Sequence, residues 1–197
     1  MPLWGATDAD ESKPKHLTTA QKKEVYAAAG GWTIEAGSTM TGNGNTSATP
    51  EVLVAIGSLT TSLGSADITG IEWITTAADK SAGFTLSVRA RFNEFVDVDT
   101  TSGTPYLAIT NGNEGSGTGR GPHNLAYASG TGTNELVFSL AIAAANAATN
   151  ADDVLTIGAN AMNLNSGTIK DAGTSTNATI TSSSAIGTAA GTITVVA

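Results

Sequence analysis

The feature that most constrains the fold is strict alternation of apolar and polar residues in GFTLSVRARFNEF, residues 83–95. In an extended chain, one side of this segment carries Phe84, Leu86, Val88 and Ala90, and the other carries Thr85, Ser87, Arg89 and Arg91. A period of two is typical of a β-strand with one buried face, and a helix would scatter these apolar side chains around its axis. The segment therefore predicts a strand of a half-buried sheet.

Shorter segments with the same alternation recur from about residue 66, separated by turns rich in Gly, Asn and Asp. Intervals near 8–12 residues are typical of an all-β sandwich. We therefore predict an all-β fold with an antiparallel β-sandwich over 66–197. The predicted core includes Phe84, Leu86, Val88, Leu107, Ile109, Leu136, Phe138 and Leu140, and Trp73 is also expected to be buried.

The first 65 residues have a different pattern and form a separate predicted unit, 1–65. Residues 1–16 are predicted to form an extended arm, because Pro2 and Pro14 oppose a helix. Thr18 and Gln21 have capping-box spacing and are followed by good helix formers, which predicts one short helix over about 19–29. The segments GWTIEAG and EVLVAIG predict two strands after it.

Composition excludes several classes of partner. The net charge of −8 opposes nucleic-acid binding, which needs clustered Lys and Arg to neutralise phosphates. Apolar runs fall short of the roughly 20 residues that cross a bilayer, so no membrane partner is expected, and the acidic start MPLWGATDADE predicts no signal peptide. With no cysteine, the chain has neither disulfides nor thiolate ligands.

No motif predicts catalysis. The loop GSGTGRG, residues 115–121, lacks the strand and helix that frame a dinucleotide site, and it lacks the Lys-Ser/Thr of a Walker loop. His16 and His123 stand alone, without a zinc-binding spacing. No nucleophile elbow is visible around a serine. We therefore expect a protein that is not an enzyme.

Two acidic pairs, Asp97/Asp99 and Asp152/Asp153, offer hard oxygen ligands of the kind that calcium prefers. Two carboxylates are too few for a calcium site, so solvated turns are the expected role, with no metal or cofactor. Arg89 and Arg91 are expected to face solvent on the polar side of their strand, with Glu94 or Asp97 nearby as partners.

The central part of the chain resembles a known family. A pattern of Phe, Glu and Val, then Gly-x-Pro-x-Leu, then Tyr-x-Ser-Gly-x-Gly-Thr runs through RFNEFVDVDTTSGTPYLAITNG, LAYASGTGTNELVFSLAI and AMNLNSGTIKDAG. It is occupied by Phe92, Glu94, Val96, Val98, Gly103, Pro105, Leu107, Tyr127, Ser129, Gly130, Gly132, Thr133, Leu136 and Phe138. Over about 68–173 the chain resembles the bacterial Ig-like sandwich domains of repeat adhesins and phage virion proteins.

The opening MPLWG, with its Asp-rich and Lys-Pro-Lys continuation, is similar to the start of structural proteins of tailed phages that infect marine cyanobacteria. Together the two resemblances imply a virion protein made in the host cytoplasm. The leading function is a capsid decoration or cement protein, bound to the major capsid protein or other virion proteins and forming a homo-oligomer. The alternatives are a tail or neck ornament, or a displayed Ig-like module that binds a host surface or carbohydrate.

The N-terminal arm is the predicted partner-binding site. Leu3 and Trp4 form an apolar pair in polar surroundings, and Lys13 and Lys15 follow in a charged stretch. Tryptophan is enriched among interface anchors, and neighbouring charges orient a docking partner. Fraying of a chain terminus is the alternative for this arm.

Overall fold

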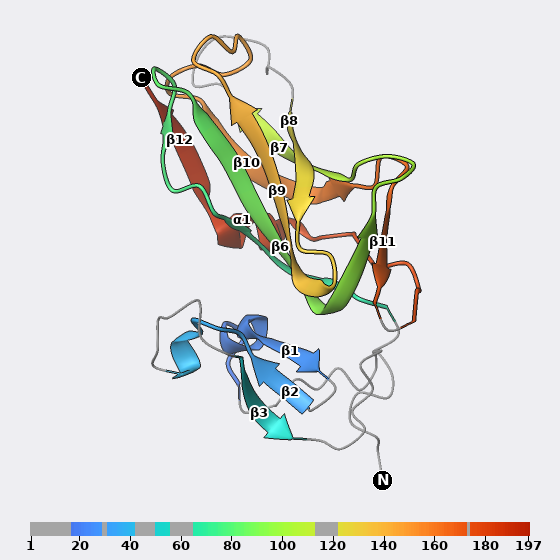
Figure 1. Cartoon of the computed structure of the whole chain (residues 1–197). Coiled ribbons are helices and arrows are strands. Elements are labelled where there is room, and N and C mark those ends of the chain that lie inside the picture. The colour runs from blue at the N-terminus through green and yellow to red at the C-terminus, as the bar shows by residue number, and fades with distance from the viewer. Residues whose placement is uncertain (1–16, 29–30, 42–49, 56–64, 113–121, 173) are drawn as a thin grey trace.

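The chain forms two β-sheets in a computed structural model that describes residues 17–28, 31–41, 50–55, 65–112, 122–172 and 174–197 (Figure 1). A three-stranded sheet in the order β1-β2-β3 lies within residues 25–55, and a nine-stranded sheet lies within 68–196. The strands are β1 (Val25–Ala28), β2 (Gly31–Ile34), β3 (Glu51–Ala55), β4 (Ile68–Trp73), β5 (Ala78–Asp79), β6 (Phe84–Asp99), β7 (Tyr106–Gly112), β8 (His123–Ser129), β9 (Thr133–Ile142), β10 (Val154–Asn163), β11 (Thr168–Asp171) and β12 (Thr192–Val196). The predicted all-β class is confirmed.

The larger sheet is curled. Its order is β11-β6-β9-β8-β7-β10-β12-β5, with β4 also paired to β6. Its pairs are antiparallel except for the short parallel pair of β5 and β12. Because β8 pairs with both β9 and β7, hydrogen bonding is continuous around the curl. The Ig-like form of the sandwich stays a prediction.

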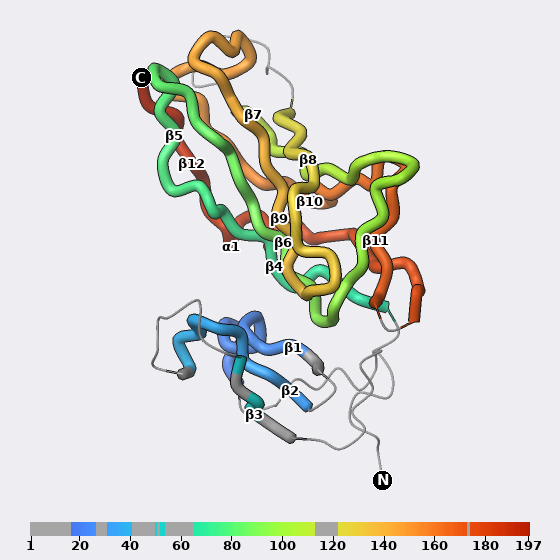
Figure 2. Tube along the Cα trace, viewed as in Figure 1, coloured from blue at the N-terminus to red at the C-terminus, as the bar shows by residue number. Residues whose placement is uncertain are grey.

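The long strand β6 organises the larger sheet. Its residues 84–91 and Val96 pair with β9, its residues 88–92 pair with β4, and its last residues, 96–99, pair with β11. A register shift in the β9 pairing lies between Arg91 and Val96, where β11 replaces β4 on the other edge of β6. Such irregularities increase the bend and twist of a strand, and Figure 2 shows the course of the β6 trace.

The predicted core lies inside the curl. Leu86, Val88, Leu107, Ile109, Leu136 and Phe138 are completely buried, as their alternation predicted. Phe84 and Leu140 are only partly buried and pack against the edge of this core. Trp73 is also half-buried, and its indole Nε1 donates to the carbonyl oxygen of Gly191 at 3.2 Å.

The helix predicted over 19–29 is wrong. Thr18 and Gln21 do form the reciprocal bonds of a capping box, but they begin only the 3-10 helix η2 (Gln21–Glu24). At Val25 the backbone turns to φ −125° and ψ 134°, and the chain continues as β1. Val25 and Tyr26 are both buried there, and this tertiary burial outweighs local helix propensity.

The α-helix in the described part of the chain, α1 (Ser184–Ala190), falls instead in the low-complexity tail. It packs against β10 and β4, where the sheet curls. Gly187 permits this approach, because a Cβ there would lie 1.8 Å from the carbonyl oxygen of Ile157. A second 3-10 turn, η3 (Thr39–Thr41), follows β2. No helix among the described residues has the length and apolar character that crossing a bilayer requires.

Candidate functional site

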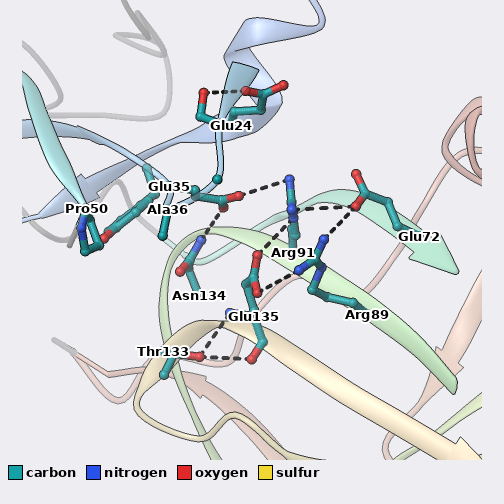
Figure 3. A pocket seen from close by; sticks show the side chains of 13 residues that line it. Glu24, Glu35, Ala36, Pro50, Glu72, Arg89, Arg91, Thr133, Asn134 and Glu135 are labelled. Atoms are coloured by element: carbon teal, nitrogen blue, oxygen red, sulfur yellow. Dashed lines mark hydrogen bonds and ion pairs between the residues drawn. The ribbon is translucent and has the colours of Figure 1, made fainter. Parts of the chain in front are cut away.

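A cleft of about 470 Å³ lies where the small sheet meets the outer face of β4, β6 and β9, and it is called the main cleft below (Figure 3). Glu24, Tyr26, Glu35, Ser38 and Pro50 line it from the N-terminal segment. Glu72, Arg89, Arg91, Asn134 and Glu135 line it from the larger sheet. These residues come from six separate places in the sequence, so the cleft exists only in the folded chain.

Strand pairing sets the positions of its two arginines. On β6, Arg89 lies opposite Glu72 of β4, and Arg91 lies opposite Glu135 of β9. Side chains directly opposite each other on one face of a sheet interact across the strands. Arg89 contacts Glu72 at 3.0 Å and Glu135 at 3.3 Å. Arg91 contacts Glu135 at 3.0 Å through Nε and Glu72 at 3.6 Å.

Glu35 links the small sheet to this network. It follows β2 directly, and its carboxylate lies 3.0 Å from Arg91 Nη1. Asn134 Nδ2 donates to the same carboxylate at 2.9 Å. The side chains of Arg91 and Glu35 are only 12% and 10% exposed, so this ion pair is largely shielded from water.

The expected solvent-facing position is wrong for Arg91, whose side chain is 12% exposed, whereas Arg89 keeps 32% of its side chain exposed. The expected partners are wrong for both arginines, because the small sheet and the neighbouring strands supply other carboxylates at this part of β6. Glu94 is buried on the opposite face of β6, among core positions, and Asp97 is exposed. The partners are Glu35, Glu72 and Glu135, which are distant in sequence.

Burial governs the charge of Glu35. It raises the pKa of this carboxyl above its ordinary value of 4.5, against the opposing attraction of Arg91. Burial also raises the pKa of Tyr26, and the negative charges of Glu35 and Glu135 add to that effect. Both shifts show that the cleft disfavours further negative charge.

At the rim of the cleft, Glu24 holds a polar turn of the small sheet. Its carboxylate accepts from the Ser38 hydroxyl at 2.5 Å and from the backbone N–H of Thr39 at 3.1 Å. These contacts tie η2 to the segment that follows β2. They give Glu24 a structural role at the rim of the cleft.

His123 belongs to a second polar cluster. It is buried at the start of β8, and its Nε2 lies 3.0 Å from the hydroxyl of Thr149, which is fully buried. Burial lowers the pKa of His123, while Asp153 opposes that shift. A hydroxyl without access to solvent cannot attack a substrate, so this pair fastens the loop before β10 to the sheet.

Each acidic pair has one carboxylate that closes a turn, Asp99 or Asp153, but Asp97 lies within β6 and Asp153 is buried instead of solvated as expected. Asp99 Oδ1 accepts from the N–H of Thr101 at 2.8 Å, and Asp153 Oδ2 accepts from the N–H of Asn150 at 2.8 Å. Asp152 has a φ of 68°, typical of a turn. Within the described ranges, no group of three or more His, Cys, Asp or Glu is placed to hold a metal ion.

The predicted partner-binding residues, Leu3, Trp4, Lys13 and Lys15, lie outside the described residues, as do His16 and the loop 115–121. Sequence reasoning missed Glu35, Glu72, Glu135 and Asn134. Arg89 and Arg91 on the polar side of β6 were the sequence feature that could have indicated these partners, because arginines require counter-charges once another layer covers them.

Comparisons with protein-family models, curated proteins and solved structures found no match to this chain.

Proposed function

We propose that the protein is a non-enzymatic structural component of a tailed-phage virion, with capsid decoration or cementing as its leading role. The supporting observation is that the charged groups of the main cleft bind one another. Arg89 and Arg91 are each held by at least two carboxylates, and Asn134 is bonded to Glu35. Such a network stabilises a junction between layers and leaves neither guanidinium free to bind a substrate anion.

The sequence supports the same role. The acidic, β-rich chain resembles virion Ig-like domains over about 68–173, and its first residues are similar to phage structural proteins. A decoration protein occupies many equivalent sites on a shell, so weak individual contacts add up to large stabilisation. The expected partners are the major capsid protein, other virion proteins and further copies of this chain.

The test is to bind the purified, labelled full-length protein to particles that lack it and to image them by electron microscopy. Regular labelling over the shell is expected. Label confined to the neck or tail would support the ornament alternative, and binding of the free protein to host-surface glycans would support the recognition alternative. Particles of an unrelated phage serve as the control. Equal labelling of both particles, or no labelling of either, would overturn the virion role.

A further inference from the structure

The two sheets have separate hydrophobic cores. The small one contains Leu17, Val25, Trp32 and Ile34, with Met40 and Leu53 packed against it. The core of the larger sheet draws all its described members from residues 66–195. No described residue belongs to both clusters, so burial of apolar surface stabilises each unit largely by itself.

The junction between the units is mainly polar. Glu35 brings a carboxylate from the small sheet to Arg91 and Asn134 of the larger one. Beside it, the rings of Tyr26 and Phe95 meet with their centroids 5.6 Å apart, yet Phe95 remains 40% exposed. Removing Arg91 would leave the shielded carboxylate of Glu35 without its cation, so docking of the charged form depends on Arg91.

The junction also contains more anions than cations. Glu24, Glu35, Glu72 and Glu135 line the cleft against only Arg89 and Arg91. Tyr26 of β1 is the other titratable group that lines it, and Lys22 and Lys23 of η2 do not. Docking therefore brings the carboxylate of Glu35 near the like charge of Glu135, and a proton on Glu35 would remove that repulsion.

We propose that the three-stranded sheet is a releasable module, held on the larger sheet by the Arg91–Glu35 contact and docked more firmly as the pH falls toward 5. Release separates the two units at their polar junction and leaves both hydrophobic cores intact. This release depends only on contacts within the chain, so the proposal does not require any particular binding site on the phage particle.

The direction of the pH effect follows from proton linkage. Burial gives Glu35 a higher pKa in the docked state, so that state binds more protons than the released state. The contribution is complete below the ordinary value of 4.5 and is lost as the pH rises through the raised pKa. One proton changes the ratio of released to docked molecules by at most about tenfold per pH unit.

The experiment measures the distance between the two units. Because the chain has no cysteine, Val52→Cys on β3 and Ala141→Cys on β9 give two exposed spin-label positions in the full-length protein. Pulsed electron paramagnetic resonance should show a narrow distribution of the distance between the two spin labels at pH 5 and a broad component that grows toward pH 9. Circular dichroism should stay constant over this range.

Two variants distinguish the contribution of the Arg91 cation from that of the Glu35 carboxylate. Arg91→Gln leaves Glu35 facing Glu135 without its cation, and at pH 7.5 it should increase the released population at least about tenfold. Lowering the pH to 5 should return the released population of Arg91→Gln toward that of the unsubstituted protein. Glu35→Gln retains a hydrogen-bonding side chain without the buried charge, so its distribution should stay narrow and lose most of its pH dependence.

A narrow, pH-independent distribution in both the unsubstituted protein and Arg91→Gln would overturn the proposal, and so would release that grows toward pH 5. If Arg91→Gln fails to fold by circular dichroism, the pH series of the unsubstituted protein decides alone. A distance distribution that stays constant from pH 5 to 9 would then contradict the proposed release of the three-stranded sheet.

Discussion

At the scale of single residues, the protein uses charged and polar side chains to fasten segments that lie far apart in the sequence. Lys80 follows β5, and its ammonium donates to the carbonyl oxygens of Ala143, Ala144 and Asn146, the last at 2.7 Å. His123 similarly reaches Thr149 before β10. Each side chain holds one end of the same connection between β9 and β10.

Replacing Lys80 tests the first fastening. Lys80→Met keeps much of the aliphatic stem but removes the charged donor, so the free energy of unfolding should fall by about 1.5–3 kcal/mol. Lys80→Arg serves as the control for charge, and its planar guanidinium should recover only part of the loss. Urea denaturation measures both. Equal stability of Lys80→Met and the unsubstituted protein would show that the three bonds contribute nothing net.

The pH dependence of the free energy of unfolding tests the second contact, between His123 and Thr149. Because burial lowers the pKa of His123 in the folded state, the unfolded chain binds more protons, and stability should fall as the pH drops below the ordinary value of 6.5. Glu35 has the opposite effect, so the comparison is made against His123→Gln. The unsubstituted protein should lose more stability than this variant between pH 7.5 and 5.5. Parallel urea midpoints over that range would contradict the assignment.

At the scale of elements, helix α1 depends on a close approach to β10. Gly187→Ala should lower the free energy of unfolding by about 1–3 kcal/mol, because the added methyl group meets the Ile157 carbonyl and overpacks the contact. Gly70→Ala is the matched control, since a Cβ there meets no atom within 4 Å. The control should be neutral or more stable by up to about 1 kcal/mol. Equal thermal midpoints for the two variants would show that α1 can shift without cost.

At the scale of the whole molecule, we expect the proposed particle anchor, residues 1–16, to be separable from the folded units. Deleting residues 1–16 should leave the circular dichroism spectrum β-rich while preventing incorporation into particles. Trp4→Ala should weaken binding by about 2 kcal/mol, or roughly thirtyfold, if the indole is an interface anchor. Ser12→Ala in the same arm is the control. Wild-type occupancy of the truncated protein would remove the docking role from the arm.

A chelator supplies a further test at this scale. Asp99 and Asp153 accept backbone N–H groups of turns, from Thr101 and Asn150. We therefore expect the thermal midpoint to stay unchanged in EDTA. A fall of many degrees would reveal a bound ion that stabilises the fold.

The sequence by itself determined the strands with clear alternation, such as β6 and β9, and which of their faces is apolar, because alternation is a local property of the sequence. It therefore predicted the burial of Leu86, Val88 and Phe138 and the all-β class.

The tertiary structure decided which polar faces are covered by another layer and which secondary structure the segments without clear alternation adopt. Val25 became part of a strand because β2 pairs with it, and α1 formed against β10 in a tail with little pattern of its own. Arg91 is shielded because Glu35 and Glu135 converge on it from distant parts of the chain. Alternation records which side of a strand can enter a core, but whether another layer covers the polar side depends on contacts between residues far apart in sequence.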